Sequence, residues 1–266
     1  MRLALLVSLS ASLLVSPLAA NIAPARVSLP SRAEKKTLAV IAFDNNTGKS
    51  DYDHLGKGIS TMMTNDLASV DDIQVVERDR LADVLAEIKL QQSTSFDSTT
   101  AVKVGKLVGA EYIVTGAFVS ADPQMRIDTR IIRVQSGVIV KTASVTGKGD
   151  RFLELEKQLS RQLIRDLNVT LTPEGEAKLD RRQANGITNV EDANRMANAI
   201  DLSDRGDYAE AAVKIAPLVA KYPNSAMLKL TSDEIKKRAA KSSKQKAKDK
   251  INETVGGLIK KKWPPR

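Results

Sequence analysis

Apolar positions from residue 37 onward fall into runs and stripes that predict alternating strands and helices. Residues 37–43 (TLAVIAF) form a continuous apolar run with β-branched members, which is typical of a strand buried on both faces. From His54 a stripe at helical spacing predicts a helix with one buried face, formed by Leu55, Ile59, Met62, Met63 and Leu67. Asp66 lies beside this stripe and is expected to point toward solvent. Residues 73–76 predict a second strand.

Two further helices are predicted before the next strand. Asp79 is placed to cap the first, whose apolar positions recur at steps of three and four. Residues 91–97 are polar and predict a loop. Ser98 is placed to cap the second helix, and Gly109 suits the left-handed position at its end.

The middle of the chain predicts a strand, a hairpin and a helix. Residues 112–119 are apolar and strand-like, and residues 126–134 and 138–145 flank a turn at 135–137. A helix follows, with one apolar face formed by Phe152, Leu155, Leu159, Leu163 and Leu167. This order predicts an α/β fold with a mixed sheet flanked by helices, parallel at the crossovers and antiparallel at the hairpin.

The C-terminal third changes character, because its pattern is helical and Ala-rich. Pro173 after Thr172 predicts a helix start, and residues 180–190 are expected to form a linker. The expected organisation is an export signal at 1–25, an α/β domain at 35–170, a helix and linker at 171–190, a helical region at 191–235 and a basic tail at 236–266. The tail is expected to be helical or disordered.

Charge is concentrated in that tail. Residues 236–266 hold twelve Lys or Arg against two acidic residues, so the tail accounts for the net charge of +9. The nearly neutral remainder gives no nucleic-acid-binding surface. Near its end, Ile251, Val255, Leu258, Ile259 and Trp263 recur at helical spacing beside Lys260, Lys261 and Lys262, as in a basic amphipathic surface anchor. Contact with a membrane surface, contact with an anionic partner, and plain disorder remain open.

The first residues predict export. A cation at Arg2 precedes the apolar residues 3–14, which are too few to span a bilayer. Ala23-Pro24-Ala25 fits a cleavage site, residues 18–20 form a second candidate, and an uncleaved anchor is the alternative. We expect a periplasmic protein, with attachment at the periphery of the outer membrane left open.

Composition limits the chemistry. Cysteine is absent, which excludes disulfides, thiolate catalysis and a lipid on Cys, and the lone histidine is His54. The triplet Gly48-Lys49-Ser50 lacks the preceding glycine of a phosphate-binding loop, because Phe43 stands there. No paired acids or metal-ligand spacings appear, so we expect no enzyme activity, no cofactor, no metal and no catalytic residues.

Three motifs together resemble the CsgG-type family, named for a curli secretion component, and the related TolB-N-terminal-like and FlgO-like periplasmic domains. They are FDNNTG at 43–48, VERDRL at 76–81 with the residues that follow, and GKLVGAEYIVTG at 105–116. The positions that carry the resemblance are Phe43, Asn45, Thr47, Gly48, Glu77, Arg78, Leu81, Gly109, Ala110 and Gly116. All are interpreted as structural, with Glu77 and Arg78 expected to pair with each other or to remain solvated.

The resemblance implies an envelope assembly or scaffold component that acts through contacts with envelope proteins, with self-association left open. The alternative is an outer-membrane secretion channel subunit of the curli type. Two departures weigh against it: the lipidated Cys is missing, and the connections near 120–124 and 147–150 leave no room for membrane hairpins. In the helical region, GDYAEA at 206–211 and Pro223 resemble part of a single tetratricopeptide-like hairpin.

Overall fold

The computed structural model describes residues 35–87, 98–121 and 123–262, and residues 34–266 form one compact unit. The predicted export signal, its cleavage sites and the loop at 91–97 lie outside the described residues. The domain boundaries expected from the sequence remain predictions.

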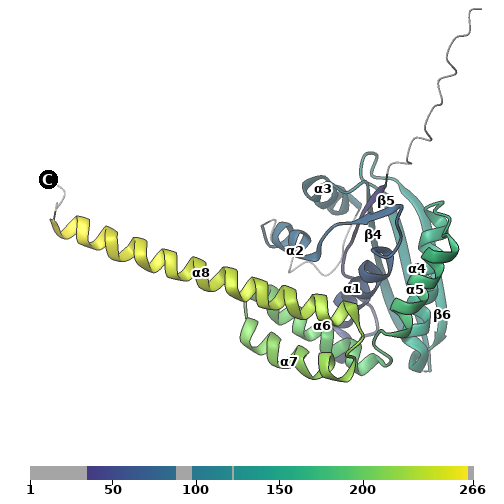
Figure 1. Cartoon of the computed structure of the whole chain (residues 1–266). Coiled ribbons are helices and arrows are strands. Elements are labelled where there is room, and N and C mark those ends of the chain that lie inside the picture. The colour runs from purple at the N-terminus through teal and green to yellow at the C-terminus, as the bar shows by residue number, and fades with distance from the viewer. Residues whose placement is uncertain (1–34, 88–97, 122, 263–266) are drawn as a thin grey trace, which may run out of the picture. The chain divides into compact units, whose positions relative to one another are not determined.

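A mixed six-stranded sheet lies at the centre of this unit (Figure 1). Its strands run in the order β3-β1-β4-β5-β6, with the short β2 beside β4. β1 pairs parallel with β3 and β4, whereas β4, β5 and β6 pair antiparallel, as the sequence predicted. The strands are β1 (Lys36–Val40), β2 (Asp44–Asn45), β3 (Ile73–Val75), β4 (Tyr112–Ala121), β5 (Gln124–Arg133) and β6 (Ile139–Lys148).

Eight α-helices accompany the sheet in the described part of the chain. They are α1 (Leu55–Leu67), α2 (Arg78–Glu87), α3 (Ser98–Val108), α4 (Phe152–Asp166), α5 (Pro173–Ala184), α6 (Val190–Arg205), α7 (Tyr208–Lys221) and α8 (Ala226–Lys262). The apolar stripes predicted for α1 and α4 are buried in full. Thr172 caps α5, because its Oγ1 accepts a hydrogen bond from the Gly175 N–H at 3.1 Å. The expected linker is shorter than predicted, since α5 continues to Ala184.

Alternate residues of β1 face two different cores, because successive strand side chains point to opposite faces. Leu38 and Val40 belong to the larger core with residues of α1 and α4, whereas Ala39 and Ile41 belong to the smaller core with residues of α3. The larger core continues into the C-terminal helices through Ile200, Ile215, Leu218, Leu228 and Ile235. The helical region therefore shares the core of the sheet.

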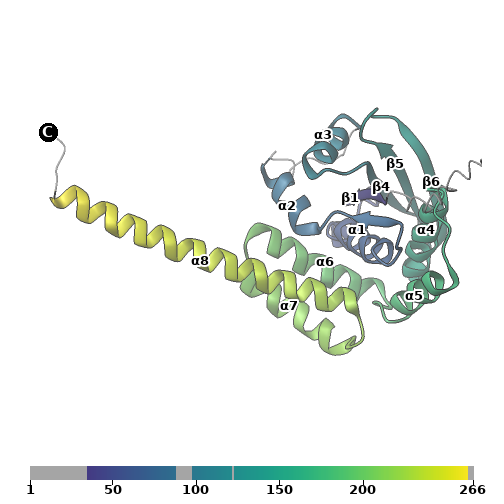
Figure 2. The same cartoon turned by 45° about the horizontal axis from the view of Figure 1, so that its top comes forward.

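Helix α1 lies between the sheet and the C-terminal helices (Figure 2). Its contact with α6 is close because Gly58 has no side chain. A Cβ at Gly58 would lie 3.2 Å from the carbonyl oxygen of Ala193 and 3.3 Å from the Cβ of Ala197. Small residues on both helices thus set how closely they approach.

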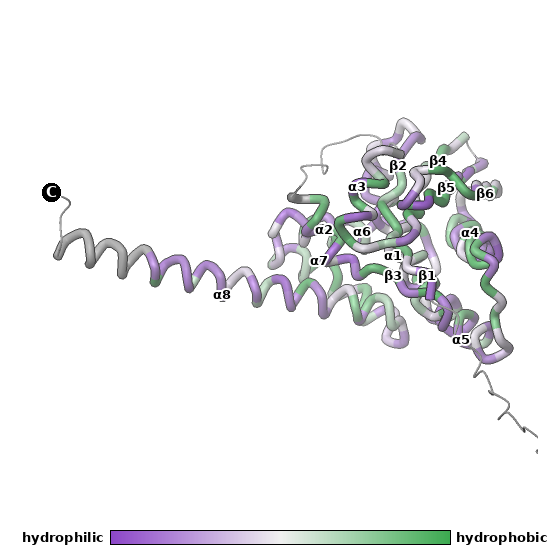
Figure 3. The backbone as a smooth tube through the Cα atoms, turned by 90° about the horizontal axis from the view of Figure 1, so that it is seen from above, coloured by the Kyte–Doolittle hydropathy of each residue, from purple (hydrophilic) through white to green (hydrophobic). Residues whose placement is uncertain are grey.

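The basic tail is a direct continuation of α8. The last buried residue on this helix is Ile235, and the described side chains from Lys236 to Asn252 are exposed or half-buried. The coloured part of this segment is mostly hydrophilic (Figure 3). Of the two forms that the sequence left open for the tail, the structure shows a helix as far as Lys262.

Phe43 is held between two glycines. Its ring is so close to β4 that a Cβ at Gly116 would lie 2.6 Å from Phe43 Cε1 and 2.0 Å from the carbonyl oxygen of Asp128. On the other side, a Cβ at Gly56 would lie 1.8 Å from the carbonyl oxygen of Phe43. Both glycines are required by these close approaches, which join β1, β4 and the start of α1.

We expect Gly116→Ala to lower the free energy of unfolding by about 2–4 kcal/mol, because backbone of β5 must move to admit the methyl group. Urea denaturation followed by circular dichroism measures this loss. The control is Gly149→Ala, where the nearest atom to a Cβ is 3.8 Å away and little change is expected. Equal stability of the two variants would contradict the packing argument.

Candidate functional site

The first motif shapes the turn after β1. Asn45 Oδ1 accepts hydrogen bonds from Thr47, at 3.0 Å from its N–H and 2.6 Å from its hydroxyl. Asn45 Nδ2 donates to the carbonyl oxygen of Lys49 at 2.9 Å and to Asp53 Oδ1 at 2.8 Å. Gly48 has φ of 71°, the left-handed region that favours glycine.

The Gly48-Lys49-Ser50 triplet lies in this turn. A short 3₁₀ helix, Ser50–Tyr52, follows it, and α1 begins only at Leu55. A phosphate-binding loop leads directly into a helix N-terminus, so this arrangement differs from one. The four side-chain hydrogen bonds of Asn45 give the motif a structural role.

The second motif leads from β3 into α2, and its residues lie in different environments. Leu81 is buried in the smaller core, whereas Glu77 is exposed. Arg78 pairs with acidic residues of other helices, and not with Glu77 as one expectation had it. Its guanidinium reaches Asp204 on α6 at 3.0 Å and Glu234 on α8 at 3.5 Å.

The third motif ends α3 and begins β4. Gly109 has φ of 71° directly after the last residue of α3, as predicted for a helix end. Ala110 is buried in the smaller core, and Gly116 lies against Phe43 as described above. The structure therefore brings Phe43 and Gly116 together and places Arg78 elsewhere, at the junction with the C-terminal helices.

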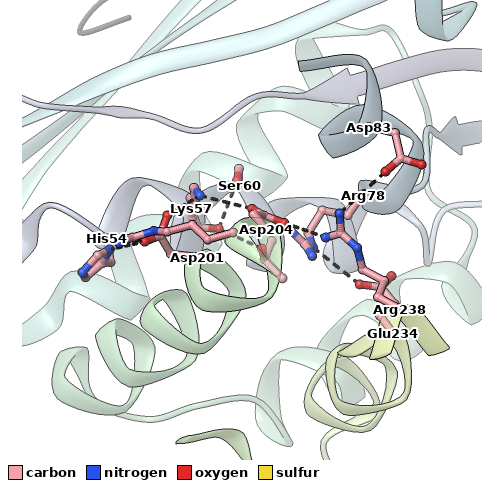
Figure 4. Close-up of polar contacts among 11 residues, drawn as sticks. His54, Lys57, Ser60, Arg78, Asp83, Asp201, Asp204, Glu234 and Arg238 are labelled. Atoms are coloured by element: carbon pink, nitrogen blue, oxygen red, sulfur yellow. Dashed lines mark hydrogen bonds and ion pairs between the residues drawn. The ribbon is translucent and has the colours of Figure 1, made fainter. Parts of the chain in front are cut away.

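Asp204 is the centre of that junction (Figure 4). Its carboxylate lies 3.1 Å from Lys57 Nζ, 3.0 Å from Arg78 Nη1 and 2.7 Å from Arg238 Nη1. These cations come from α1, α2 and α8, while Asp204 is on α6. We call Lys57, Arg78, Asp204 and Arg238 the Asp204 cluster.

The cluster is largely withdrawn from water, since the side chains of Asp204, Arg238 and Arg78 are 7%, 13% and 16% exposed. Burial opposes ionisation of Asp204, but the charges of Arg78 and Lys57 and the hydrogen bonds from Arg238 and Arg78 outweigh it and lower its pKa. Asp204 is therefore ionised at neutral pH, and it joins four helices that are far apart in the sequence.

His54, the lone histidine, lies at the edge of this cluster. Its Nδ1 is 3.6 Å from Asp201 Oδ2. Asp201 also forms ion pairs with Lys57, whose Nζ is 2.5 Å from Asp201 Oδ1, and with Arg205. Burial lowers the pKa of His54, and the cations Arg205 and Lys57 lower it further. A neutral imidazole beside an ion-paired carboxylate has a structural role here, as a boundary residue.

Sequence reasoning missed Asp201, Asp204 and Arg238 altogether. The sequence offered two signals. Asp201 and Asp204 lie one turn apart near the end of an Ala-rich helix, and Lys57 lies between two glycines. They do not identify partners, because Arg78 and Asp204 are 126 residues apart in the chain.

A second polar group lies in the interior and corrects the prediction for Asp66. Asp66 is only 5% exposed, and its Oδ2 accepts a hydrogen bond from Gln183 Nε2 at 2.6 Å. Glu156 on α4 is 3% exposed and accepts a hydrogen bond from the Ser160 hydroxyl at 2.9 Å. Asp66 faces inward because α5 covers this side of α1, which the pattern of α1 alone does not reveal.

Burial disfavours the ionisation of both carboxyls. Burial raises the pKa of Asp66 to about 6, although Gln183, Lys157 and Arg182 partly oppose the shift. Burial, and then the charge of Asp66, raise the pKa of Glu156 well above its usual range. Both line a cavity of about 20 Å³, which has room for about one water molecule.

The remaining site predictions concern metal and membrane contact. Among the described residues, no group of three or more His, Asp or Glu side chains is arranged to hold a metal ion. None of the helices in the described segments is both long and apolar enough to cross a membrane. The side chains of the predicted surface anchor, Lys260, Lys261, Lys262 and Trp263, lie outside the described residues.

We expect Asp204→Asn to lower the free energy of unfolding by about 2–4 kcal/mol, because three partly buried cations would lose their shared carboxylate. Urea denaturation measures the change. Asp233→Asn is the matched control on α8: that carboxylate is 73% exposed and pairs with the exposed Lys236, so a loss under about 0.5 kcal/mol is expected. A small loss at Asp204 would show that the cluster does not hold the helices.

The acidic pair predicts a pH dependence. The folded state binds the Asp66 proton more tightly than the unfolded state does, so its stabilising effect is complete below about pH 4 and is lost as pH rises through about 6. The loss amounts to about 3 kcal/mol at most for a pKa raised from 3.8 to about 6. Asp66→Asn should remove the part of the decline that is due to Asp66 and leave the part due to Glu156, and it should unfold at higher urea than the unmodified protein at pH 7.5.

Urea midpoints at several pH values from 4.5 to 7.5 measure the decline. Asp72→Asn, an exposed carboxylate near the end of the same helix, is the control and should keep the full pH dependence. An identical pH profile for Asp66→Asn and the unmodified protein would rule out Asp66 as its source.

Comparison with known proteins supports the sequence motifs. A family model described as "Curli production assembly/transport component CsgG" matches residues 25–125, which include all ten motif positions. The comparison with curated proteins gave no match.

Solved structures with similar chains include the LpoB C-terminal domain from Escherichia coli, with 17% identity over 46% of this chain and 89% of that one and a TM-score of 0.38. PelC from Paraburkholderia phytofirmans, solved as a dodecamer, has 16% identity over 51% and 90% and a TM-score of 0.34. TolB from Acinetobacter baumannii has 12% identity over 50% and 28% and a TM-score of 0.35. The family match confirms the resemblance to the CsgG-type family over residues 25–125, which include β1 to β4.

Proposed function

We propose that this chain is a non-enzymatic, exported cell-envelope protein that acts as an assembly or scaffold component through protein–protein contacts in the periplasm. The CsgG family match supports the envelope role, because the family model is described as an assembly and transport component. The export signal predicted at residues 1–25 supports the location, and peripheral attachment to the outer membrane would be consistent with the basic tail.

The observation that carries this proposal is an apolar stripe on the outer face of α7. Ala209, Ala212, Val213, Ala216 and Ala220 recur at helical spacing and are all exposed, with Val213 exposed to 71%. The opposite face of α7 is buried through Ala211, Ile215 and Leu218. Small side chains allow another helix to approach closely, as between the helices of tetratricopeptide repeats.

The way the stripe is held also favours a contact surface. α7 packs against α6 and α8, and the Asp204 cluster ties both of those helices to α1 and α2. An exposed apolar surface on a well-supported element loses little conformational entropy when a partner binds. We therefore assign the stripe to an apolar helix of an envelope protein, either another protein or a second copy of this chain.

The chemistry of the interior supports the absence of catalysis. The carboxyls with the most strongly perturbed ionisation, Asp66 and Glu156, line a cavity of about 20 Å³ that is too small for a substrate. The other large polar group, the Asp204 cluster, consists of ion pairs between helices.

The channel alternative is less well supported. Only two residues separate β4, which ends at Ala121, from β5, which begins at Gln124. A single 3₁₀ turn, Gly149–Arg151, joins β6 to α4. These are the connections that would have to carry membrane hairpins.

The test uses the tagged, full-length chain in its native host, with cell fractionation followed by cross-linking. We expect recovery from the envelope fraction with discrete cross-linked partners, which Ala216→Glu should abolish because it places a charge in the apolar stripe. Lys214→Glu is the control, since this exposed residue lies on α7 beside the stripe, and it should retain the partners. Circular dichroism confirms that both variants fold.

Two results would contradict the proposal. One is recovery of the chain from the cytoplasm, or from the envelope without any cross-linked partner. The other is capture of the same partners by Ala216→Glu and Lys214→Glu, which would exclude α7 as the contact surface.

A further inference from the structure

A cleft between α2, α7 and α8 is lined by an excess of positive charge. Its volume is about 710 Å³, within the range of small-molecule sites. Five cations line it: Arg80 on α2, and Lys237, Arg238, Lys241 and Lys246 on α8. Asp83 on α2 is the one carboxylate among the lining residues.

The single carboxylate is already engaged. Asp83 Oδ1 lies 3.7 Å from Arg238 Nη2, and Arg238 is also 2.7 Å from Asp204. Arg80, Lys237, Lys241 and Lys246 have no ion pair with any carboxylate of the described residues. Four cations around one cleft repel each other, and an anion bound among them would relieve that repulsion.

The cleft is pre-formed on both walls. Arg238 is held by Asp204, which fixes this part of α8 against α6, and Arg78 ties the start of α2 to the same carboxylate. The two walls therefore share one anchor, which holds the start of α2 and this part of α8 at a fixed separation. Such preorganisation reduces the entropy lost on binding.

The lining groups fit oxyanions that carry more than one charge. Lys237 and Lys241 are one helical turn apart on α8, and Arg80 belongs to the opposite wall, so cations approach from two sides. The hydroxyls of Tyr208 and Ser242 and the amide of Gln245 add neutral donors. A phosphate group carries about two negative charges and three acceptor oxygens, and it accepts both guanidinium and ammonium donors.

We infer that this cleft binds a ligand with two or more closely spaced phosphate groups, either a free polyphosphorylated molecule or a phosphorylated lipid headgroup. The inference is separate from the proposed scaffold role, because the apolar stripe that carries that role lies on α7 outside the lining of the cleft. It assigns to the inner part of the basic segment, Lys237 to Lys246, a defined ligand chemistry.

Tripolyphosphate is the first probe, titrated calorimetrically into the full-length protein at ~0.1 M NaCl, where diffuse attraction is screened beyond about 10 Å. We expect saturable binding at one site per chain. The double variant Lys237→Gln/Lys241→Gln should weaken binding about ten-fold or more, and Arg80→Gln on the other wall should weaken it as well. Circular dichroism checks that each variant keeps its helical content.

The matched control is Lys236→Gln/Lys244→Gln, which removes the same charge from the same helix at residues that do not line the cleft. It should change the affinity less than two-fold. Absence of saturable binding by the unmodified protein would overturn the inference. Equal weakening by the two double variants would also overturn it, because net charge rather than the cleft would then attract the anion.

A second arm identifies the source of the phosphate. Co-sedimentation with phosphatidylcholine vesicles that contain cardiolipin, a lipid with two phosphate groups in its headgroup, and with vesicles of phosphatidylcholine alone is measured with and without tripolyphosphate. Binding to the anionic vesicles that falls with tripolyphosphate and with Lys237→Gln/Lys241→Gln supports a lipid headgroup. Saturable tripolyphosphate binding without such vesicle binding supports a free polyphosphorylated ligand.

Discussion

Asp204 ties together four helices, of which α1, α6 and α8 also share the larger hydrophobic core. Its carboxylate receives cations from α1, α2 and α8, and it is itself near the end of α6. The group is mostly buried, so each charge depends on the others to offset its loss of hydration. The cluster therefore adds to the shared core and to the close α1–α6 contact in positioning the C-terminal helices, and with them α7.

Arg238 connects the cluster to the rest of α8. Up to Ile235 this helix contributes to the larger core, and from Lys236 to Asn252 its side chains are exposed or half-buried and mostly hydrophilic (Figure 3). Arg238 lies where α8 passes from its packed part to its exposed part, and there it pairs with Asp204 and with Asp83. One residue thus ends the packed part of the helix and begins the cationic wall of the proposed phosphate site.

Besides the Asp204 cluster, three glycines bring elements of the fold into close contact. Gly58 lets α6 approach α1, and Gly56 and Gly116 let backbone and ring atoms of Phe43 lie where a Cβ would otherwise be. Asp66 and Glu156 are different, because they are polar groups buried in the interior. Burial raises the pKa of both carboxyls and so favours their protonated forms. Among the motif residues, Phe43 and Gly116 take part in the close approaches and Gly48 and Gly109 adopt positive φ, so their role here is structural.

The sequence by itself determined the order and type of the elements, because the periods of two and 3.6 in apolar positions are local properties of the chain. It also identified the left-handed glycine at position 109 and the helix start at Pro173, whose geometry is set by a few adjacent residues. Only the tertiary structure decided that Asp66 faces inward, that Arg78 pairs with Asp204, and that Arg80 and Lys241 line one cleft. These depend on helices that meet across more than a hundred residues of chain, and the charge of a residue does not name the partner that will neutralise it.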